Sequence, residues 1–166
     1  MLTKNFYSYI RSSFSGSDTI ATFTKTDGTI SNVSTNINHP PFKVMNSWAR
    51  SNTSIGVSFG TGTTPATASD YFLESLLTDN QISVSTPSAV SFSRGDAYDE
   101  YSVTFGVTNK TANDITISEI GLTAMPYSPS SGSNVYALVD RTVLDEPVTI
   151  PAKQSKQITY TIRFNY

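Results

Sequence analysis

The chain of 166 residues contains no cysteine and one histidine, and only 14% of its residues are charged. Without cysteine there is no disulfide framework, no thiolate zinc ligand and no thiol nucleophile. The net charge of −2 leaves no positive field for nucleic-acid phosphates, and the 11 lysines and arginines are scattered. The longest apolar run, residues 135–139, is too short to cross a membrane, and the first residues lack the apolar stretch of a signal peptide. We therefore expect no nucleic-acid partner and no membrane segment.

Hydroxyl and aromatic residues are abundant instead. The chain has 25 serines and 23 threonines, and 11% of its residues are aromatic. Few charges with many threonines and aromatics are typical of pleated, half-buried β surfaces. A content of 37% hydrophobic residues argues against disorder, and the length suits one domain with its own core. Composition therefore predicts an all-β domain that obtains its stability from burial.

The N-terminal part, residues 1–40, is the most polar. Two β-like runs, residues 20–25 and 29–33, flank Asp27 and Gly28. Glycine supplies the positive φ of a hairpin turn, so this pattern predicts a β-hairpin. We expect residues 1–40 to form an N-terminal arm or hairpin that makes assembly contacts.

The main body, residues 41–166, shows the period of two that β-strands require. Short strands are predicted at residues 42–48 and 54–59, and apolar residues alternate with polar ones from Tyr101 to Val107. About eight to ten short strands separated by turns indicate a β-sandwich, jelly-roll-like in preference to immunoglobulin-like.

Three further features of the body have specific structural meanings. Residues 115–124 switch their apolar positions from odd to even, which predicts a bulge near Ser118 and Glu119. Residues 135–139 are apolar at every position, which predicts a central strand covered on both faces. Residues 69–77 are the one helical candidate, with Ser69 or Asp70 as the cap and an apolar face.

Catalytic and metal-ligating patterns are weak. His39, the only histidine, lies beside prolines, and no G-x-S-x-G motif accompanies it, so we expect no Ser-His-Asp triad. Asp96, Asp99 and Glu100 could bind calcium through oxygen atoms, although a solvated acidic turn explains them as well. The tripeptide that begins at Arg94 matches the Arg-Gly-Asp adhesion signal, but tripeptides recur by chance.

Two other patterns admit a functional and a structural interpretation. Residues 60–62, Gly-Thr-Gly, could approach a phosphate, but no Gly-Lys-Ser/Thr follows and turn geometry is the simpler explanation. Paired carboxylates could hydrolyse glycosides, yet the spacing selects no pair. The carboxylate candidates are Glu74, Glu119, Asp140, Asp145 and Glu146. We expect no catalytic residue, no cofactor and no enzyme activity.

Three stretches resemble a known family. Residues 59–74 are similar to the segment GTG-x-T-P-x-x-x-D-Y-x-L-E, and residues 107–122 to TN-x-…-ITISEIGL. Residues 138–164 are similar to L-x-x-R-T-V-L-x-E-P-V-T-I-P-A-G-…-T-Y-T-I-R-F, with Lys153 in place of the glycine. In this order they resemble small virion structural proteins of tailed bacteriophages, including gut phages of the crAss-like kind.

The resemblance covers about residues 55–166 and implies a non-enzymatic virion component that is assembled in the bacterial cytoplasm. It implies an auxiliary or decoration protein of the capsid or a head-fibre subunit, with a tail, neck or baseplate component as the alternative. The expected partners are further copies of the chain and other virion proteins, such as the major capsid protein or a fibre or tail protein. A carbohydrate- or host-binding module that uses exposed tyrosines and Trp48 is the rival from another class, and a small hydrolase is the third.

Overall fold

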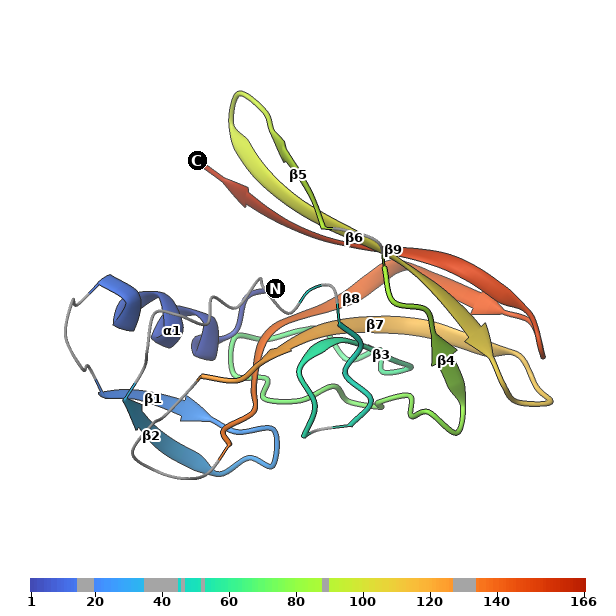
Figure 1. Ribbon diagram of the computed structural model, residues 1–166, viewed down its shortest axis with the longest axis horizontal. Helices are drawn as coiled ribbons and strands as arrows, with labels where there is room; N and C mark the ends of the chain where they lie inside the picture. Colours follow the sequence, from blue (N-terminus) through green and yellow to red (C-terminus); the bar gives the residue numbers. More distant parts are fainter. Residues whose placement is uncertain (15–19, 35–44, 46, 52, 88–89, 127–133) are drawn as a thin grey trace.

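The computed structural model describes residues 1–14, 20–34, 45, 47–51, 53–87, 90–126 and 134–166. Within these residues the chain forms one α-helix and nine strands (Figure 1). The elements are α1 (Lys4–Phe14), β1 (Ile20–Thr24), β2 (Ile30–Ser34), β3 (Gly56–Gly60), β4 (Ile82–Val84), β5 (Ser91–Arg94), β6 (Tyr98–Asn109), β7 (Ile115–Ala124), β8 (Ala137–Ile150) and β9 (Ser155–Asn165).

Two antiparallel sheets make up the main body. One has the strand order β3-β7-β8. In the other, β6 pairs with β9 along one edge and with β4 and β5 along different parts of its other edge. Residues of both sheets, among them Phe59 and Phe105, share one hydrophobic core. The predicted all-β sandwich is confirmed, whereas the preference for jelly-roll-like connections stays a prediction.

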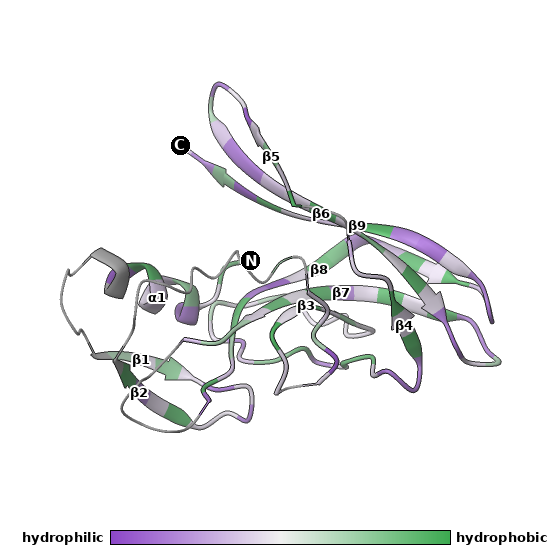
Figure 2. Cartoon of the chain, viewed as in Figure 1, coloured by the Kyte–Doolittle hydropathy of each residue, from purple (hydrophilic) through white to green (hydrophobic). Residues whose placement is uncertain are grey.

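The alternation that predicted the strands sorts side chains between the core and solvent. Val103, Phe105 and Val107 of β6 are buried, and Thr104 between them is exposed. Figure 2 shows this change of hydropathy along β6 and β9. On the outer face of this pair, hydroxyl groups meet across the strands, as in the 2.8 Å contact between the Oγ1 atoms of Thr104 and Thr159. Such cross-strand pairs stabilise a solvated face without charge.

The predicted bulge is confirmed. The register of β7 against β8 shifts between Ile117 and Glu119, at the point where the apolar positions change parity. Between these two pairs β7 advances by two residues and β8 by five, from Val148 to Val143, so the extra residues belong to β8, and β7 buries residues 117–124 without a break. A second shift follows between Leu122 and Thr123.

The apolar run at residues 135–139 is buried as expected, but its position in the sheet differs. Among the described strands β8 lies at the end of the β3-β7-β8 sheet. Its outer edge receives the first residues of the chain, because the Thr3 N–H donates to the Val139 carbonyl and the Arg141 N–H donates to the Met1 carbonyl. The run is therefore covered by the N-terminal segment instead of by a further strand of the same sheet.

The N-terminal part contains the predicted hairpin and an unpredicted helix. Strands β1 and β2 pair around the turn at Asp27 and Gly28, where Gly28 has φ +82°. Helix α1 buries Tyr9 against Phe23, and a small cluster joins them to Val135. No described helix is long and apolar enough to span a membrane. The described part of residues 1–40 thus packs on the sandwich, and an assembly contact by this part stays a prediction.

The predicted helix at residues 69–77 is wrong, because this segment forms turns. Its backbone donors have partners outside the segment. The Leu77 N–H donates to the Phe59 carbonyl at 2.8 Å, and the Ser75 N–H donates to the Glu119 carboxylate at 2.7 Å. These long-range bonds replace the bonds of a helix, which could in any case have only two turns. The strand predicted at residues 42–48 lies largely outside the described residues.

Part of the second sheet projects beyond the sandwich. It consists of residues 91–102 and 161–165, which belong to β5, β6 and β9, and we call it the projecting ribbon (Figure 1). Phe92, Tyr101 and Phe164 lie on one face of the ribbon, and Phe164 stacks on Phe6 of α1 with 5.9 Å between the ring centroids. The chain ends beside the tip of the ribbon, where the Tyr166 N–H donates to the Ala97 carbonyl.

We expect Lys153→Gly to stabilise the protein relative to Lys153→Ala. Lys153 has φ +61° in the turn between β8 and β9, and its ammonium donates to the Lys110 carbonyl. Both variants lose that bond, but only glycine relieves the left-handed strain of about 1–2 kcal/mol, against an extra chain entropy of about 0.5–1 kcal/mol. Urea unfolding should give glycine an advantage of roughly 0.5–1 kcal/mol, and equal stabilities would contradict the strain.

Candidate functional site

Of the three carboxylates proposed for calcium, Asp99 and Glu100 bind arginines within the projecting ribbon, and Asp96 is exposed. Arg94 donates to Asp99 from Nε at 2.7 Å and from a second nitrogen at 3.1 Å, which lowers the pKa of Asp99. Arg163 donates to Glu100 at 2.6 and 2.9 Å and lies over the Tyr98 ring. The described residues hold no group of three acidic or imidazole side chains arranged for a metal ion.

The adhesion tripeptide takes part in the same contacts. The Arg-Gly-Asp sequence lies at the tip of the β5–β6 hairpin, where the guanidinium of Arg94 is engaged by Asp99. His39 lies outside the described residues.

The Gly-Thr-Gly segment donates a hydrogen bond to a carboxylate of the protein itself, that of Glu119. The Gly62 N–H donates to Oε1 of Glu119 at 3.1 Å. A Cβ on Gly62 would lie 2.5 Å from Cβ of Glu74 and 2.6 Å from Oε1 of Glu119. Glycine is required here for close approach of the backbone to these two side chains.

Glu119 lies at the centre of a buried polar network. Its side chain is fully buried and accepts from three backbone N–H groups, those of Gly62, Glu74 and Ser75, at 2.7–3.1 Å. Nε of Arg141 donates to Oε2 at 2.8 Å. The buried carboxylate therefore has four hydrogen bonds and a counter-charge, as a buried ion requires.

Arg141 connects the same carboxylate to the loop at residues 61–78. Its side chain is 4% exposed and donates to Asp70 at 2.8 Å and to the Thr64 carbonyl at 3.1 Å, with Glu74 at 3.5 Å. Burial opposes its charge, but the bonds to Asp70 and Glu119 raise the pKa of Arg141. We call Glu119, Arg141, Asp70, Glu74 and the backbone of residues 62–75 the Glu119 network.

The two outer carboxylates of the network are also held ionised. Burial works against the charge of Asp70, but hydrogen bonds from Thr67 and Arg141 lower its pKa below 3.8. Hydrogen bonds from the backbone and hydroxyl of Thr64, at 2.9 and 2.8 Å, lower the pKa of Glu74. A general acid requires a raised pKa, so neither group is prepared for that role.

A second buried carboxylate, Asp140, lies beyond the network on β8. It binds the Met1 ammonium at 3.0 Å and accepts a bond of 2.8 Å from the Tyr160 hydroxyl. Burial and this carboxylate raise the pKa of Tyr160 well above 10. Asp145 and Glu146 are exposed farther along β8. The five candidate carboxylates thus comprise two buried ions, one network member and two surface groups, with no pair facing a cleft.

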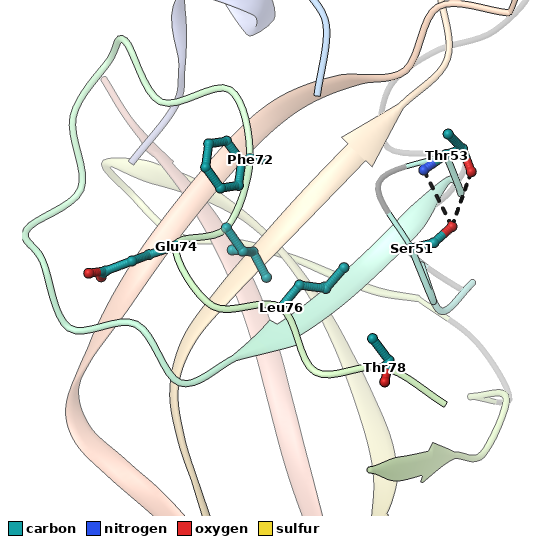
Figure 3. A pocket seen from close by; sticks show the side chains of 7 residues that line it. Ser51, Thr53, Phe72, Glu74, Leu76 and Thr78 are labelled. Carbon is teal, nitrogen blue, oxygen red and sulfur yellow. Dashed lines mark hydrogen bonds between the residues drawn. The ribbon is translucent and has the colours of Figure 1, made fainter. Parts of the chain in front are cut away.

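An open hollow of about 450 Å³ lies beside the network (Figure 3). It is lined by Ser51, Thr53, Phe72, Leu73, Glu74, Leu76 and Thr78. Figure 3 shows the Glu74 carboxylate pointing away from Ser51 and Thr53, which bond to each other. The hollow therefore presents apolar surface and hydroxyls, and its one carboxylate is engaged by Thr64.

Comparisons of the chain with protein-family models, with curated proteins and with solved structures give no match.

The three stretches that carry the sequence resemblance meet in the Glu119 network. Residues 59–74 supply Gly62, Asp70 and Glu74, the second stretch supplies Glu119, and the third supplies Arg141. Sequence reasoning weighed Glu119 as one of many carboxylates and did not identify Arg141. A charged Asp140-Arg141 pair at the end of an apolar run was the available signal, because charges in a covered strand need buried partners.

We expect Glu119→Gln to destabilise the protein by about 3 kcal/mol or more, because it removes the fully buried counter-charge of Arg141. Chemical unfolding at neutral pH measures the change. The matched control is Glu146→Gln, an exposed substitution on β8 that should cost less than about 0.5 kcal/mol. A loss below about 1 kcal/mol for Glu119→Gln would show that the network does not stabilise the fold.

Asp70→Asn should weaken the pH dependence of stability on the acid side. The pKa of Asp70 is lowered in the folded protein, so its contribution is complete above the unfolded value near 3.8 and is lost as the pH falls through the folded value. The variant should therefore be less stable than the wild type at pH 7, and the difference should shrink as the pH falls through the lowered pKa of Asp70. Urea midpoints from pH 7 to pH 2.5 test this, with Asp145→Asn as the control for removal of a carboxylate. A stability difference that stays constant with pH argues against the assignment.

Proposed function

We propose that the protein is a non-enzymatic structural component of a tailed-phage virion, either an auxiliary or decoration protein of the capsid or a head-fibre subunit. The observation that carries this proposal is the meeting of the three resembling stretches in the Glu119 network. Residues of the stretches that resemble virion structural proteins hold a loop against two strands. Residues that hold a loop in place are expected to recur among proteins that share a fold and not a reaction.

The use of polar groups supports the same proposal. The candidate carboxylates within the fold, Glu119 and Asp140, bind groups of the chain itself. Ser102 and Thr161 hydroxyls, 2.9 Å apart, continue the hydroxyl pairing on the outer face of β6 and β9. The charged residues opposite each other on this face, Glu100 and Arg163, form an ion pair, so the face can approach a neighbour without burying an unpaired ion.

Exposed aromatic side chains provide contact area. Phe92 on the projecting ribbon is 52% exposed, Tyr166 beside the tip of the ribbon is 70% exposed, and Tyr7 on α1 is 60% exposed. Aromatic residues are enriched in protein–protein interfaces, where they bury a large area with few rotatable bonds. Further copies of the chain and other virion proteins, such as the major capsid protein or a fibre or tail protein, are the proposed partners.

Two alternatives remain as outcomes of the test. A tail, neck or baseplate position would use the same kind of contact. A carbohydrate-binding module would use a platform of aromatic rings. Tyr71 and Phe72 lie beside the hollow with 4.8 Å between their ring centroids. They are better placed for such a platform than Trp48, which is partly buried against the core.

Mass spectrometry of purified virions, from a phage that encodes this sequence, should detect the protein as a stoichiometric component. Hundreds of copies per particle would indicate the capsid, and about a dozen or fewer the tail or neck. Absence from purified particles would contradict the proposal. The major capsid protein of the same sample provides the copy-number standard.

A glycan array with the purified protein separates the rival function. We expect no specific glycan binding, and Phe72→Ala is the matched variant if any signal appears. Hydrolysis of a glycan that is lost on changing one carboxylate would contradict the non-enzymatic assignment.

A further inference from the structure

Strand β9 offers a long sheet edge with no partner among the described strands. It pairs with β6 through eleven residues, from Ser155 opposite Thr108 to Asn165 opposite Tyr98, without a register shift. No described strand or bridge pairs with its other edge. Figure 1 shows β9 running from the far end of the sandwich to the projecting ribbon. Natural monomers protect such edges with proline, bulges or charged side chains; β9 contains no proline and no bulge, and its two charged residues, Lys156 and Arg163, lie near its ends.

The backbone groups that point outward can be assigned. The Tyr166 N–H donates to the Ala97 carbonyl, and the Asn109 N–H donates to the Gln154 carbonyl. Residues of an antiparallel strand alternate between bonding to one neighbour and bonding to the other side. Even-numbered residues of β9 therefore bond to β6, and the odd-numbered residues from 155 to 165 direct their N–H and C=O groups away from it.

We propose that this edge pairs with β9 of a second copy of the chain, antiparallel and around a two-fold axis at Tyr160. This register uses the whole strand, because Ser155 then lies opposite Asn165 of the second copy. It places Thr159 opposite Thr161, and both are odd-numbered residues with outward backbone groups. The result is one continuous sheet across the two copies, a self-complementary contact of the kind that closed dimers use.

The side chains agree with this register. Buried positions face buried positions, since Ile158 lies opposite Ile162, and the exposed threonines form hydroxyl pairs that continue those between β6 and β9. Lys156 lies opposite Phe164 and Arg163 opposite Gln157, so no two like charges meet. Pairing four residues out of register would place Arg163 opposite Lys153 of the second copy, which disfavours that slip.

Cysteine cross-linking tests the register directly, because the chain has no cysteine of its own. Thr159→Cys and Thr161→Cys change exposed residues, and the two chains are co-expressed with different tags. Hydrogen-bonded antiparallel pairs have Cα atoms about 5.5 Å apart, which suits a disulfide. We expect a cross-linked heterodimer under mild oxidation. Either variant alone should not cross-link, because its cysteines would lie about 7–8 Å apart on the diagonal.

A proline variant provides the second measurement. Thr161→Pro removes an N–H that points away from β6, so it should keep the fold and abolish the dimer in light scattering. The matched control, Thr161→Ala, keeps the N–H and should remain dimeric. Circular dichroism confirms that both variants are folded.

The inference rests on the proposed role as an assembling subunit, and the outcomes separate the two. An oligomer that survives Thr161→Pro and gives no mixed cross-link would overturn the β9 contact and leave the virion proposal standing. A monomer at all concentrations would likewise overturn the β9 contact. The virion proposal fails only if the protein is absent from purified particles.

Discussion

The fold depends on one buried ion pair, between Glu119 of β7 and Arg141 of β8. Two buried charges are costly unless their remaining hydrogen-bonding capacity is satisfied. Here Glu119 accepts three backbone N–H groups besides the guanidinium, and Arg141 also bonds to Asp70 and the Thr64 carbonyl. These partners come from the loop at residues 61–78, which has almost no regular secondary structure. The ion pair thus supplies the order that a helix or strand would otherwise give this loop.

The ion pair in turn depends on local backbone features. The register of β7 against β8 shifts between Ile117 and Glu119, where the side chains of β7 that face the core change parity, and Glu119 follows this shift directly. Gly62 allows the loop backbone to approach the carboxylate, because a Cβ there would collide with Glu119 and Glu74. Each feature is weak alone, but each loses its purpose without the others. This mutual dependence connects stretches that lie far apart in the sequence.

Sequence reasoning predicted the features that rest on local periodicity and missed those that rest on distant partners. The alternation around Val103 and the parity switch at Glu119 were read correctly, since both follow from the pleat of a strand. Residues 69–77 were predicted as a helix because their spacing suited one, but distant acceptors bind their N–H groups. Helix α1 was missed although Phe6, Tyr9 and Ile10 have helical spacing, because the whole N-terminal part was interpreted as a polar arm or hairpin. The ion pair of Glu119 and Arg141 was missed because it joins residues that are far apart in the sequence.

The distribution of polar groups connects the fold with the proposed role. The buried side chains of Glu119 and Arg141 bind one another. Hydroxyls cover the outer face of β6 and β9, and the backbone of β9 directs its odd-numbered donors and acceptors outward. A surface of this kind recognises a neighbour by shape and backbone hydrogen bonding more than by charge. Such recognition suits an assembly built from many identical contacts, because two strands pair well when their pleats and lengths match.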